Sequence, residues 1–211
     1  MRYLIGLNEN NVPERPSHME YLKISKYLIG LFALGRILLE SGRLLVLRFL
    51  LGYDKIPGSI KLACGVRLRA TDGALLKLGE GVSIDRFADI TAKHGTLEIG
   101  ARSYVGQFSV ICARSAITIG VDCLIAEHVS IRDQDHRFGP DLTTAKAGFT
   151  SKAITIGDNV WIGSKTTITK GVRIGDNAVI GANSVVTRDI PANSVATGAP
   201  ARVVRKTDFL P

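Results

Sequence analysis

A six-residue repeat runs from Leu76 to Val186 and constrains the fold more than any other feature of the chain. Each repeat has a branched aliphatic residue, often followed by glycine, and a small or aliphatic residue four positions later. A period of six does not fit an amphipathic helix, which has about 3.6 residues per turn. It also differs from most repeat arrays, whose units have roughly 20 to 50 residues. It is typical of a parallel β-helix in which three repeats form one triangular coil.

The aliphatic anchors of this repeat fall into five triplets, with six residues between neighbours inside each triplet. They are Leu78, Ile84, Ile90; Ile99, Val105, Ile111; Ile119, Ile125, Ile131; Ile156, Ile162, Ile168; and Ile174, Ile180, Val186. Between triplets the spacing is nine, eight, twenty-five and six residues. Every irregularity therefore follows the third repeat, which means that one corner of the triangle takes all the insertions.

Glycine supports the same phase. It follows the anchor at eight of the ten first and second repeats, namely at Gly79, Gly100, Gly106, Gly120, Gly157, Gly163, Gly175 and Gly181. After the third repeat the corresponding residues are Thr91, Cys112, Arg132, Thr169 and Thr187. We expect glycine to supply backbone freedom at two tight corners, so that the third corner differs from them.

A second inward position lies two residues before each anchor, and its mixture of small and aliphatic residues suits a narrow interior. It holds Leu76, Val82, Ala88, Leu97, Ser103, Ser109, Ile117, Cys123, Val129, Ile154, Val160, Thr166, Val172, Ala178 and Ser184. We interpret these residues as core packing. Five coils stacked at about 4.8 Å form a prism about 24 Å tall. An earlier, weaker coil is expected near Ile60, Leu62, Val66 and Leu68. The handedness of the winding does not follow from the pattern.

Composition agrees with one β-solenoid domain. The chain has 211 residues, of which 22 are glycine and only 6% are aromatic. Cys64, Cys112 and Cys123 form no CxxC pair, and we interpret them as reduced thiols that line or adjoin the core of a cytosolic protein. With no signal peptide visible, we expect a cytoplasmic location. The net charge of +8 favours acidic partners, but no aromatic and basic strip indicates nucleic-acid binding.

The N-terminal segment is apolar and cationic. Within residues 22–52 the longest uncharged stretch is Tyr27–Gly35, which is too short for a membrane-spanning helix. Wound as a helix, residues 22–52 place their charges on one arc and leave a broad apolar face. This face either lies in a membrane interface, at the inner side of the membrane, or packs against the β-helix or a sister subunit. Glycines at 30, 35 and 42 argue against one unbroken helix.

The largest insertion at the irregular corner is the segment 132–153. It holds Asp133, Asp135 and His136, and a Gly-Pro pair then turns the chain. Histidine titrates near neutral pH, and a carboxylate that accepts from one ring nitrogen leaves the other free to take a proton. We therefore predict His136 as a general base with Asp133 and Asp135 as catalytic partners. Taken alone, the D-x-D-H pattern is weak and also fits a solvated loop.

The sequence from Ile154 onward closely resembles the C-terminal half of the hexapeptide-repeat acyltransferases. The phrases NVWIG at 159–163 and GAPARVVR at 198–205 carry most of the resemblance. The branch it resembles holds maltose, galactoside and nodulation-factor O-acetyltransferases and acetyltransferases of polysaccharide biosynthesis. The resemblance implies a left-handed parallel β-helix, a homotrimer, an active site between neighbouring subunits, and acetyl-CoA as the acyl donor.

The resemblance also implies roles for single residues. His136 would deprotonate an acceptor hydroxyl, which then attacks the thioester carbonyl directly. The donor would contact Trp161 near its reactive end, Ser164 and Ala182 along the pantetheine arm, and Thr187, Arg202 and Arg205 near the nucleotide, where guanidinium groups suit phosphates.

The acceptor side departs from the family pattern. Gln107 is predicted to bind the acceptor in place of the family's asparagine, and Arg114 stands close to where an aspartate is expected. His128 is a rival general base, which the repeat phase places on a strand face rather than on the loop. His94 is a weaker third candidate, and His18 lies outside the repeats.

We predict an acetyl-CoA-dependent O-acetyltransferase that acts on a hydroxyl of a sugar or glycan precursor. The alternatives are an N-acetyltransferase of an amino-sugar and a non-catalytic trimeric β-helix scaffold. A metalloenzyme on this scaffold needs three histidines at suitable spacing, which the chain lacks, so we expect no metal. The expected domains are a helical segment at 1–58, the β-helix at 59–196 and a basic tail at 197–211. The acceptor and the acyl chain length do not follow from the sequence.

Overall fold

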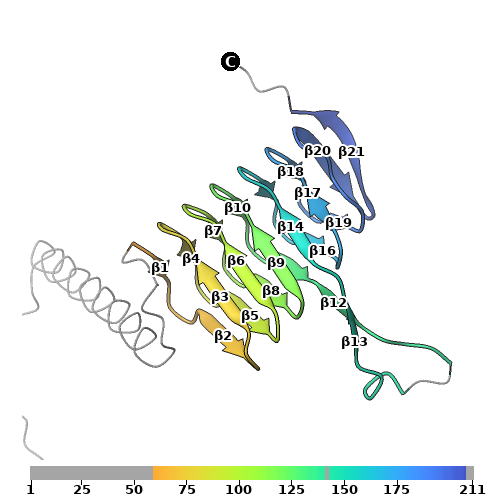
Figure 1. The fold of residues 1–211 in the computed structure, drawn as a ribbon. Helices are drawn as coiled ribbons and strands as arrows, with labels where there is room; N and C mark the ends of the chain where they lie inside the picture. The colour runs from red at the N-terminus through yellow and green to blue at the C-terminus, as the bar shows by residue number, and fades with distance from the viewer. Residues whose placement is uncertain (1–58, 141–142, 208–211) are drawn as a thin grey trace, which may run out of the picture. The chain divides into compact units, whose positions relative to one another are not determined.

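The computed structural model describes residues 59–140 and 143–207, and these residues form a parallel β-helix (Figure 1). The prediction of an all-β fold built from hexapeptide coils is therefore confirmed. The expected helical segment at 1–58, with the membrane-interface hypothesis for residues 22–52, lies outside the described residues. In the part of the chain that is described, no helix is long and apolar enough to cross a membrane.

Three sheets form the sides of the prism, and we call them A, B and C. Sheet A contains β1 (Lys61–Leu62), β4 (Ser83–Ile84), β7 (Tyr104–Val105), β10 (Leu124–Ile125), β15 (Trp161–Ile162), β18 (Val179–Ile180), β20 (Ser194–Gly198) and β21 (Ala201–Lys206). Sheet B contains β2 (Arg67–Thr71), β5 (Asp89–Lys93), β8 (Val110–Ala113), β11 (Ser130–Arg132), β16 (Thr167–Ile168) and β19 (Val185–Val186). Sheet C contains β3 (Leu75–Leu78), β6 (Thr96–Ile99), β9 (Ala116–Ile119), β14 (Ile154–Ile156) and β17 (Arg173–Ile174).

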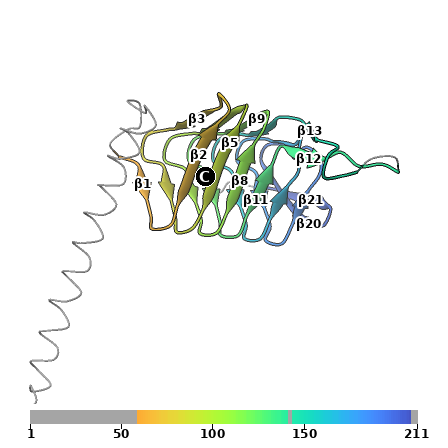
Figure 2. The ribbon, with the colours of Figure 1, turned by 90° about the horizontal axis from the view of Figure 1, so that it is seen from below.

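The chain passes from C to A to B in each coil, so the triangle has a C–A corner, an A–B corner and a B–C corner. Figure 2 shows the coils stacked along one axis, with a long excursion leaving the side of the prism. That excursion, residues 132–153, starts after β11 at the end of sheet B and returns to β14 at the start of sheet C. It therefore leaves from the B–C corner, the corner that the repeat spacing predicts.

The pairing register confirms the predicted phase. Ile99 pairs with Ile119 and Ile119 with Ile156 in sheet C, and every other set of anchors is also in register along its sheet. All anchors are buried except Leu78, which is half-buried, and all fifteen residues of the second inward position are buried. The early coil is confirmed as well, because Leu62 pairs with Ile84. One-residue slips would turn the whole apolar set outward, so burial fixes the register.

The glycines of the repeat serve a purpose other than the one expected. None of the eight has a positive φ angle. A Cβ atom on Gly100 would instead lie 2.4 Å from the carbonyl carbon of Gly120, and one on Gly79 would lie 2.4 Å from the nitrogen of Ala101. The left-handed conformation occurs two residues later, at Arg102 and its counterparts in the other coils. The expectation of backbone freedom is wrong at these positions, and close contact between coils is the reason for glycine.

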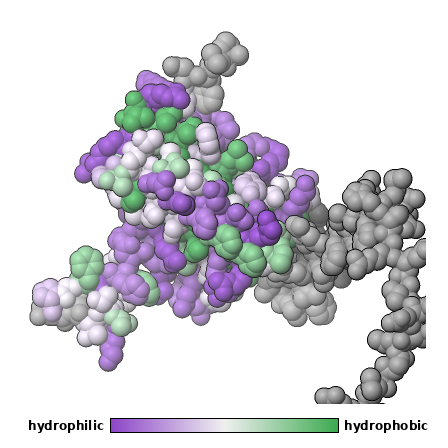
Figure 3. Space-filling model, turned by 180° about the vertical axis from the view of Figure 1, so that it is seen from behind, coloured by the Kyte–Doolittle hydropathy of each residue, from purple (hydrophilic) through white to green (hydrophobic). Residues whose placement is uncertain are grey.

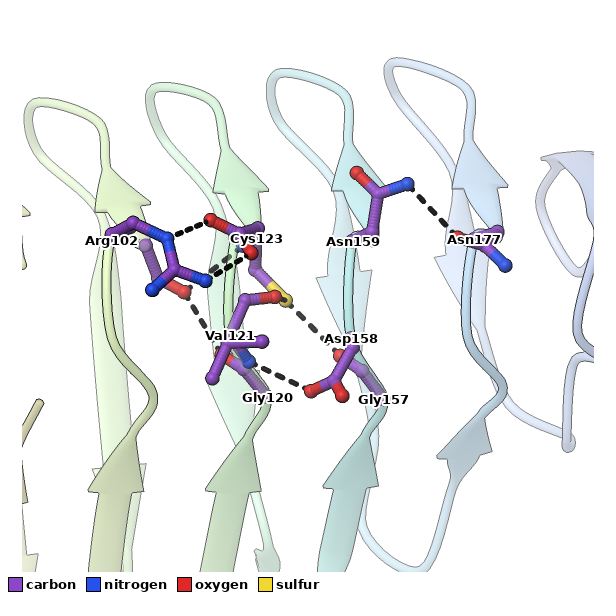
Figure 4. Close-up of polar contacts among 10 residues, drawn as sticks. Arg102, Gly120, Val121, Cys123, Gly157, Asp158, Asn159 and Asn177 are labelled. Carbon is purple, nitrogen blue, oxygen red and sulfur yellow. Dashed lines mark hydrogen bonds and ion pairs between the residues drawn. The ribbon is translucent and has the colours of Figure 1, made fainter. Parts of the chain in front are cut away.

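The C–A corner carries polar side chains that connect successive coils (Figure 4). Arg102 donates to Asp122 at 2.6 Å, and Asn159 donates to Asn177 at 2.9 Å, which in turn donates to Asn193 at 2.9 Å. The guanidinium of Arg102 lowers the pKa of the Asp122 carboxyl through their hydrogen bond. These contacts run parallel to the prism axis and supplement the backbone ladder.

The three cysteines are free thiols in three different environments. Cys123 is buried in the core, where desolvation raises the pKa of its thiol. Cys112 is half-buried in β8 of sheet B, whereas Cys64 is exposed. The expectation of a thiol at or near the core is therefore wrong for Cys64, because the turn before β2 directs it to solvent.

The C-terminal end of the prism is closed by two antiparallel strands. β20 pairs in parallel with β18, and β21 pairs with β20 in the antiparallel direction, with a bulge between Val195 and Ala196. Residues 201–206 of the expected basic tail thus form the last strand of sheet A. Residues 208–211 lie outside the described residues.

Candidate functional site

The excursion begins as a two-stranded antiparallel hairpin. β12 (Gln134–His136) pairs with β13 (Phe149–Ser151), and His136 lies opposite Phe149. In the space-filling view the excursion stands clear of the prism (Figure 3). The hairpin is therefore a paired stem that carries His136 away from sheets B and C.

Asp133 anchors this hairpin to the preceding coil. It is completely buried, and its carboxylate accepts hydrogen bonds from the backbone N–H groups of Arg114 at 2.8 Å, Ser115 at 2.7 Å and Ala116 at 2.8 Å. Carboxylates that accept several backbone N–H groups form strong, charge-assisted hydrogen bonds. Asp133 is thus occupied by the fold, and its geometry gives it a positioning role at the start of the excursion.

Asp135 anchors the hairpin from the other side. Its carboxylate forms an ion pair with Lys170, which follows β16 at the B–C corner of the next coil. The hairpin is therefore tied to the coil before it through Asp133 and to the coil after it through Asp135.

His136 is exposed, and its ring rests on the ring of Phe149, with the centroids 4.3 Å apart and the planes at 40°. Within residues 59–140 and 143–207 its imidazole has no hydrogen bond to a carboxylate, since Asp133 and Asp135 have other partners. The catalytic assignment of these three residues stays a prediction. The structure brings them together on one hairpin but leaves both ring nitrogens of His136 open to a ligand.

Arg114 and Phe149 complete the surroundings of His136. The guanidinium carbon of half-buried Arg114 lies 4.4 Å from the centroid of the Phe149 ring, in a cation–π contact. The sequence drew attention to Arg114 but not to Phe149. An exposed aromatic residue inside a polar insertion is the signal that would have identified it.

Trp161 belongs to a different part of the molecule, the outer face of sheet A. It is 53% exposed and lies in one row with Leu124 and Val179. The row continues through Val195 to Arg205, three strands beyond Trp161, or about 14 Å at the usual strand spacing. Arg202 is paired with Thr197 on the same strands. Both arginines are exposed and make hydrogen bonds only to neighbouring backbone carbonyls among the described residues.

Ser164, Ala182 and Gln107 all lie at the A–B corner. Ser164 and Ala182 occupy the same turn position in consecutive coils, and the N–H of Asn183 donates to the Ser164 carbonyl at 2.8 Å. Gln107 is at that turn position two coils earlier. Thr187 differs from these residues, because it follows β19 and so lies at the B–C corner.

The predicted site residues therefore form two groups within one prism. Trp161, Ser164, Ala182, Arg202, Arg205 and Gln107 lie on sheet A or its border with sheet B. Asp133, Asp135, His136 and Thr187 lie at the B–C corner, which is the corner opposite sheet A. Within one subunit, His136 and Trp161 therefore do not lie next to each other.

The rival base His128 is not on a strand face as expected. It sits in the A–B turn between β10 and β11 with a φ angle of 58°, and its ring stacks on Phe108 with the centroids 5.2 Å apart. Phe108 in turn stacks on Phe87 at 5.4 Å. The expectation is wrong because the third residue of this turn adopts the left-handed conformation in each coil and points outward. His94, at the B–C corner, is 3.9 Å from the carboxylate of Asp72.

Among the described residues no group of three or more His, Cys, Asp or Glu side chains is placed to hold a metal ion. The expectation that the chain needs no metal stays a prediction.

Comparisons with known proteins agree with the repeat. A family model described as "Bacterial transferase hexapeptide (six repeats)" matches residues 153–188. An Escherichia coli K12 protein named "Putative lipopolysaccharide biosynthesis O-acetyl transferase WbbJ" is 32% identical, over 70% of this chain and 78% of its own length. The polysialic acid O-acetyltransferase of E. coli O1:K1 is 41% identical, over 56% of this chain and 39% of its own length.

The chain spans about half the length, or less, of the first curated relatives that it matches. Among solved structures, AntD, an N-acyltransferase of Bacillus cereus in complex with dTDP and 3-hydroxybutyryl-CoA, superimposes with a TM-score of 0.62 at 18% identity. The match covers 72% of this chain and 81% of AntD. At that identity the likeness concerns the fold.

Proposed function

The chain belongs to the hexapeptide-repeat family of bacterial transferases, and from this premise we propose that it transfers an acetyl group from acetyl-CoA to a hydroxyl of a sugar or glycan precursor. Relatives named as O-acetyltransferases of lipopolysaccharide biosynthesis and of polysialic acid support this choice of reaction and acceptor class. Acetyl-CoA as the donor is supported by the acyl-CoA bound to AntD, which has the same fold.

In the proposed reaction His136 accepts the proton of the acceptor hydroxyl. The oxygen forms a bond to the thioester carbonyl carbon, the carbon–sulfur bond breaks, and the proton on His136 passes to the departing thiolate. Histidine suits both transfers because its pKa lies near neutral pH, and such catalysis contributes about 10²–10⁴-fold to a rate. Asp133 and Asp135 contribute by fixing the hairpin to two coils rather than by touching the imidazole.

The donor is proposed to lie along the outer face of sheet A. The row from Trp161 to Arg205 leads from the proposed reactive end of the donor to the two arginines, and Ser164 and Ala182 lie on the adjoining corner. Arg202 and Arg205 would meet the phosphates at the far end, because guanidinium groups form bidentate contacts with phosphate.

Assembly follows from the separation of the two groups. Because His136 and Trp161 lie on opposite sides of one prism, a complete site requires the hairpin of one subunit to meet sheet A of another. We propose a homotrimer, in which each subunit contributes to two sites, and Thr187 reaches the donor from the hairpin's side. We also propose a cytoplasmic location, with residues 22–52 available for peripheral membrane contact.

One observation carries the proposal: His136 is exposed on a stem that two carboxylates fix to the prism. The test is the His136→Ala variant, assayed by release of free CoA thiol with a panel of nucleotide sugars, free sugars and lipid-linked glycans. Transfer should fall at least a hundredfold, while CoA binding and oligomer mass stay unchanged. His128→Ala is the control, and equal loss from it with a harmless His136→Ala would exchange the two assignments.

The same panel separates the alternatives. Acetylation of an amino-sugar nitrogen, located by NMR, would identify an N-acetyltransferase. An assembled protein that binds CoA and acetylates nothing would favour the non-catalytic scaffold.

A further inference from the structure

We propose that Arg114 binds a negative charge on the acceptor, so that the acceptor is an anionic glycan bearing carboxylate or phosphate groups. This inference rests on the proposed transferase function and specifies the substrate class of the same site. It starts from the direct chain of contacts that links the guanidinium of Arg114 to the imidazole of His136 through Phe149.

The contact chain places a cation beside the proposed base. Arg114 is 4.4 Å from the Phe149 ring centroid, and that centroid is 4.3 Å from the centre of the His136 ring. These two steps place the guanidinium carbon at most about 9 Å from the centre of the imidazole ring, which is the span of one to two sugar units. A hydroxyl delivered to His136 would therefore leave other substituents of the same or the adjoining sugar within reach of the guanidinium.

The guanidinium of Arg114 is prepared for an anion. Within residues 59–140 and 143–207 it forms neither a hydrogen bond nor an ion pair, although the side chain is half-buried. The guanidinium lies over the face of the Phe149 ring, which leaves the N–H groups at its edge available. A stacked guanidinium presents planar, paired donors that match carboxylate and phosphate oxygens.

The anchor of the excursion at Asp133 does not involve the Arg114 side chain. Asp133 accepts from the backbone N–H groups of Arg114, Ser115 and Ala116, which any residue supplies. Replacement of the Arg114 side chain therefore leaves the anchoring of the hairpin intact.

The surrounding charge favours the same kind of ligand. The sequence of the excursion contains four cations, Arg132, Arg137, Lys146 and Lys152, and three carboxylates, Asp133, Asp135 and Asp141. Lys170 adds a further cation by its ion pair with Asp135. These groups together carry a net positive charge, which favours acidic substrates.

The experiment uses three acceptors on one glycan backbone with the full-length protein. One carries uronic acid carboxylates, one carries phosphate, and one is the neutral form made by reducing the carboxylates to alcohols. Steady-state kinetics with acetyl-CoA, and binding of each glycan to the His136→Ala variant by calorimetry, are measured for native Arg114, Arg114→Gln and Arg114→Lys. Lys93→Ala serves as the matched control, since it removes one positive charge at the same corner one coil away.

We expect at least one anionic glycan to have a KM at least tenfold below that of the neutral form, and the two anionic arms identify the group that is bound. Arg114→Gln should raise that KM about tenfold to a hundredfold with little change in kcat, and should weaken binding to the His136→Ala variant equally. Arg114→Lys should recover part of the loss, and Lys93→Ala should change KM less than threefold.

Equal kinetics for neutral and anionic acceptors would overturn the inference while leaving the transferase function standing. So would an Arg114→Gln variant that loses the same factor with all three glycans, because the stacked arginine would then only pack the hairpin. An absence of transfer to every acceptor, together with no glycan binding, would overturn both proposals.

Discussion

The C–A and B–C corners of the same prism are built in opposite ways. At the C–A corner each coil contributes a turn with glycine, and side chains such as Asn159 and Asn177 bond along the axis. At the B–C corner the turns differ in length, and residues 132–153 leave the prism altogether. At this corner the Asp133 carboxylate accepts hydrogen bonds from three backbone N–H groups.

The contrast shows how a repetitive fold makes room for chemistry. A corner that every coil must pass at close contact cannot change length without separating the strands, because adjacent coils touch through backbone atoms. The B–C corner has one such contact, at Gly95, where a Cβ would lie 2.0 Å from the Ser115 carbonyl oxygen, but Gly73 and Gly148 have open space around them. Where the space is open the corner can lengthen, provided that some group satisfies the backbone donors exposed at the insertion. Asp133 does this, and so the insertion can carry His136.

The largest effect is expected from breaking the anchor of the irregular corner. Asp133→Ala leaves three part-buried backbone N–H groups without their acceptor and removes a buried side chain, which should lower the free energy of unfolding by about 3–5 kcal/mol. Urea denaturation of the two proteins measures this difference. Asp176→Ala is the counterpart at the C–A corner, where an exposed carboxylate accepts from the single N–H of Asp158, and should cost about 1 kcal/mol. Equal losses would contradict the comparison.

A smaller effect should follow from adding one methyl group at each corner. A Cβ at Gly100, in the C–A corner, would lie 2.4 Å from backbone atoms of the next coil, so Gly100→Ala should cost about 1–3 kcal/mol. Gly73, in the B–C corner, has open space around it and a φ angle of 76°, so Gly73→Ala should cost only about 1 kcal/mol of backbone strain. Thermal unfolding of both variants is the measurement, and a larger loss of stability in Gly73→Ala than in Gly100→Ala would contradict this prediction.

A third prediction separates positioning from stability. Lys170→Ala removes the ion pair with Asp135, which is partly exposed, and should change the free energy of unfolding by roughly 0.5 kcal/mol. Transfer should nevertheless fall severalfold, since the hairpin that carries His136 loses its ion pair with the next coil. Lys77→Ala, which removes the Lys77–Glu98 pair of sheet C, should leave transfer unchanged. Unaltered kinetics in Lys170→Ala would show that Asp133 positions the hairpin alone.

The smallest effect concerns the exposed pair at the C–A corner. Arg102 lowers the pKa of Asp122, so this pair stabilises the fold above the ordinary pKa of aspartate and ceases to do so as the pH falls through the lowered value. In Arg102→Ala the pKa of Asp122 should return upward, and the fall in unfolding free energy below about pH 4 should become slightly shallower. Unfolding series at pH 2 to 7 compare the two proteins, and a steeper fall in the variant would contradict the assignment.

Much of the prism could be predicted because its core is one-dimensional. Each anchor meets the anchors of the coils above and below, so the spacing of isoleucines such as Ile125 and Ile162 gives the pairing register directly. The role of the glycines could not be predicted in the same way, because the distance between the backbones of stacked coils depends on both coils and does not follow from the sequence of one. His128 was misplaced for a related reason, since a hexapeptide gives the order of its residues but not which one adopts the left-handed conformation.

The candidate site residues could be named from the sequence, and their roles stay predictions, but their arrangement could not be predicted. His136 was identifiable from its place in the excursion, and the corner of the excursion from the spacing of the repeats. The partners of Asp133 and Asp135 were not identifiable from the sequence. The backbone donors to Asp133 lie in an earlier coil, and Asp135 pairs with a lysine 35 residues later. The contact of Arg114 with Phe149 depends on the hairpin register, which a sequence of mixed polarity does not determine.

The row from Trp161 to Arg205, the proposed binding face for the acyl donor, has a consequence for how such a protein could come to accept a donor of another length. Its length is a whole number of strand spacings, because each coil adds one strand to sheet A. Duplication of one complete coil between β15 and β18 would lengthen the row by about 4.8 Å and leave both ends chemically unchanged. The length of the row can therefore change only by whole coils, whereas the excursion can gain, lose or exchange single residues.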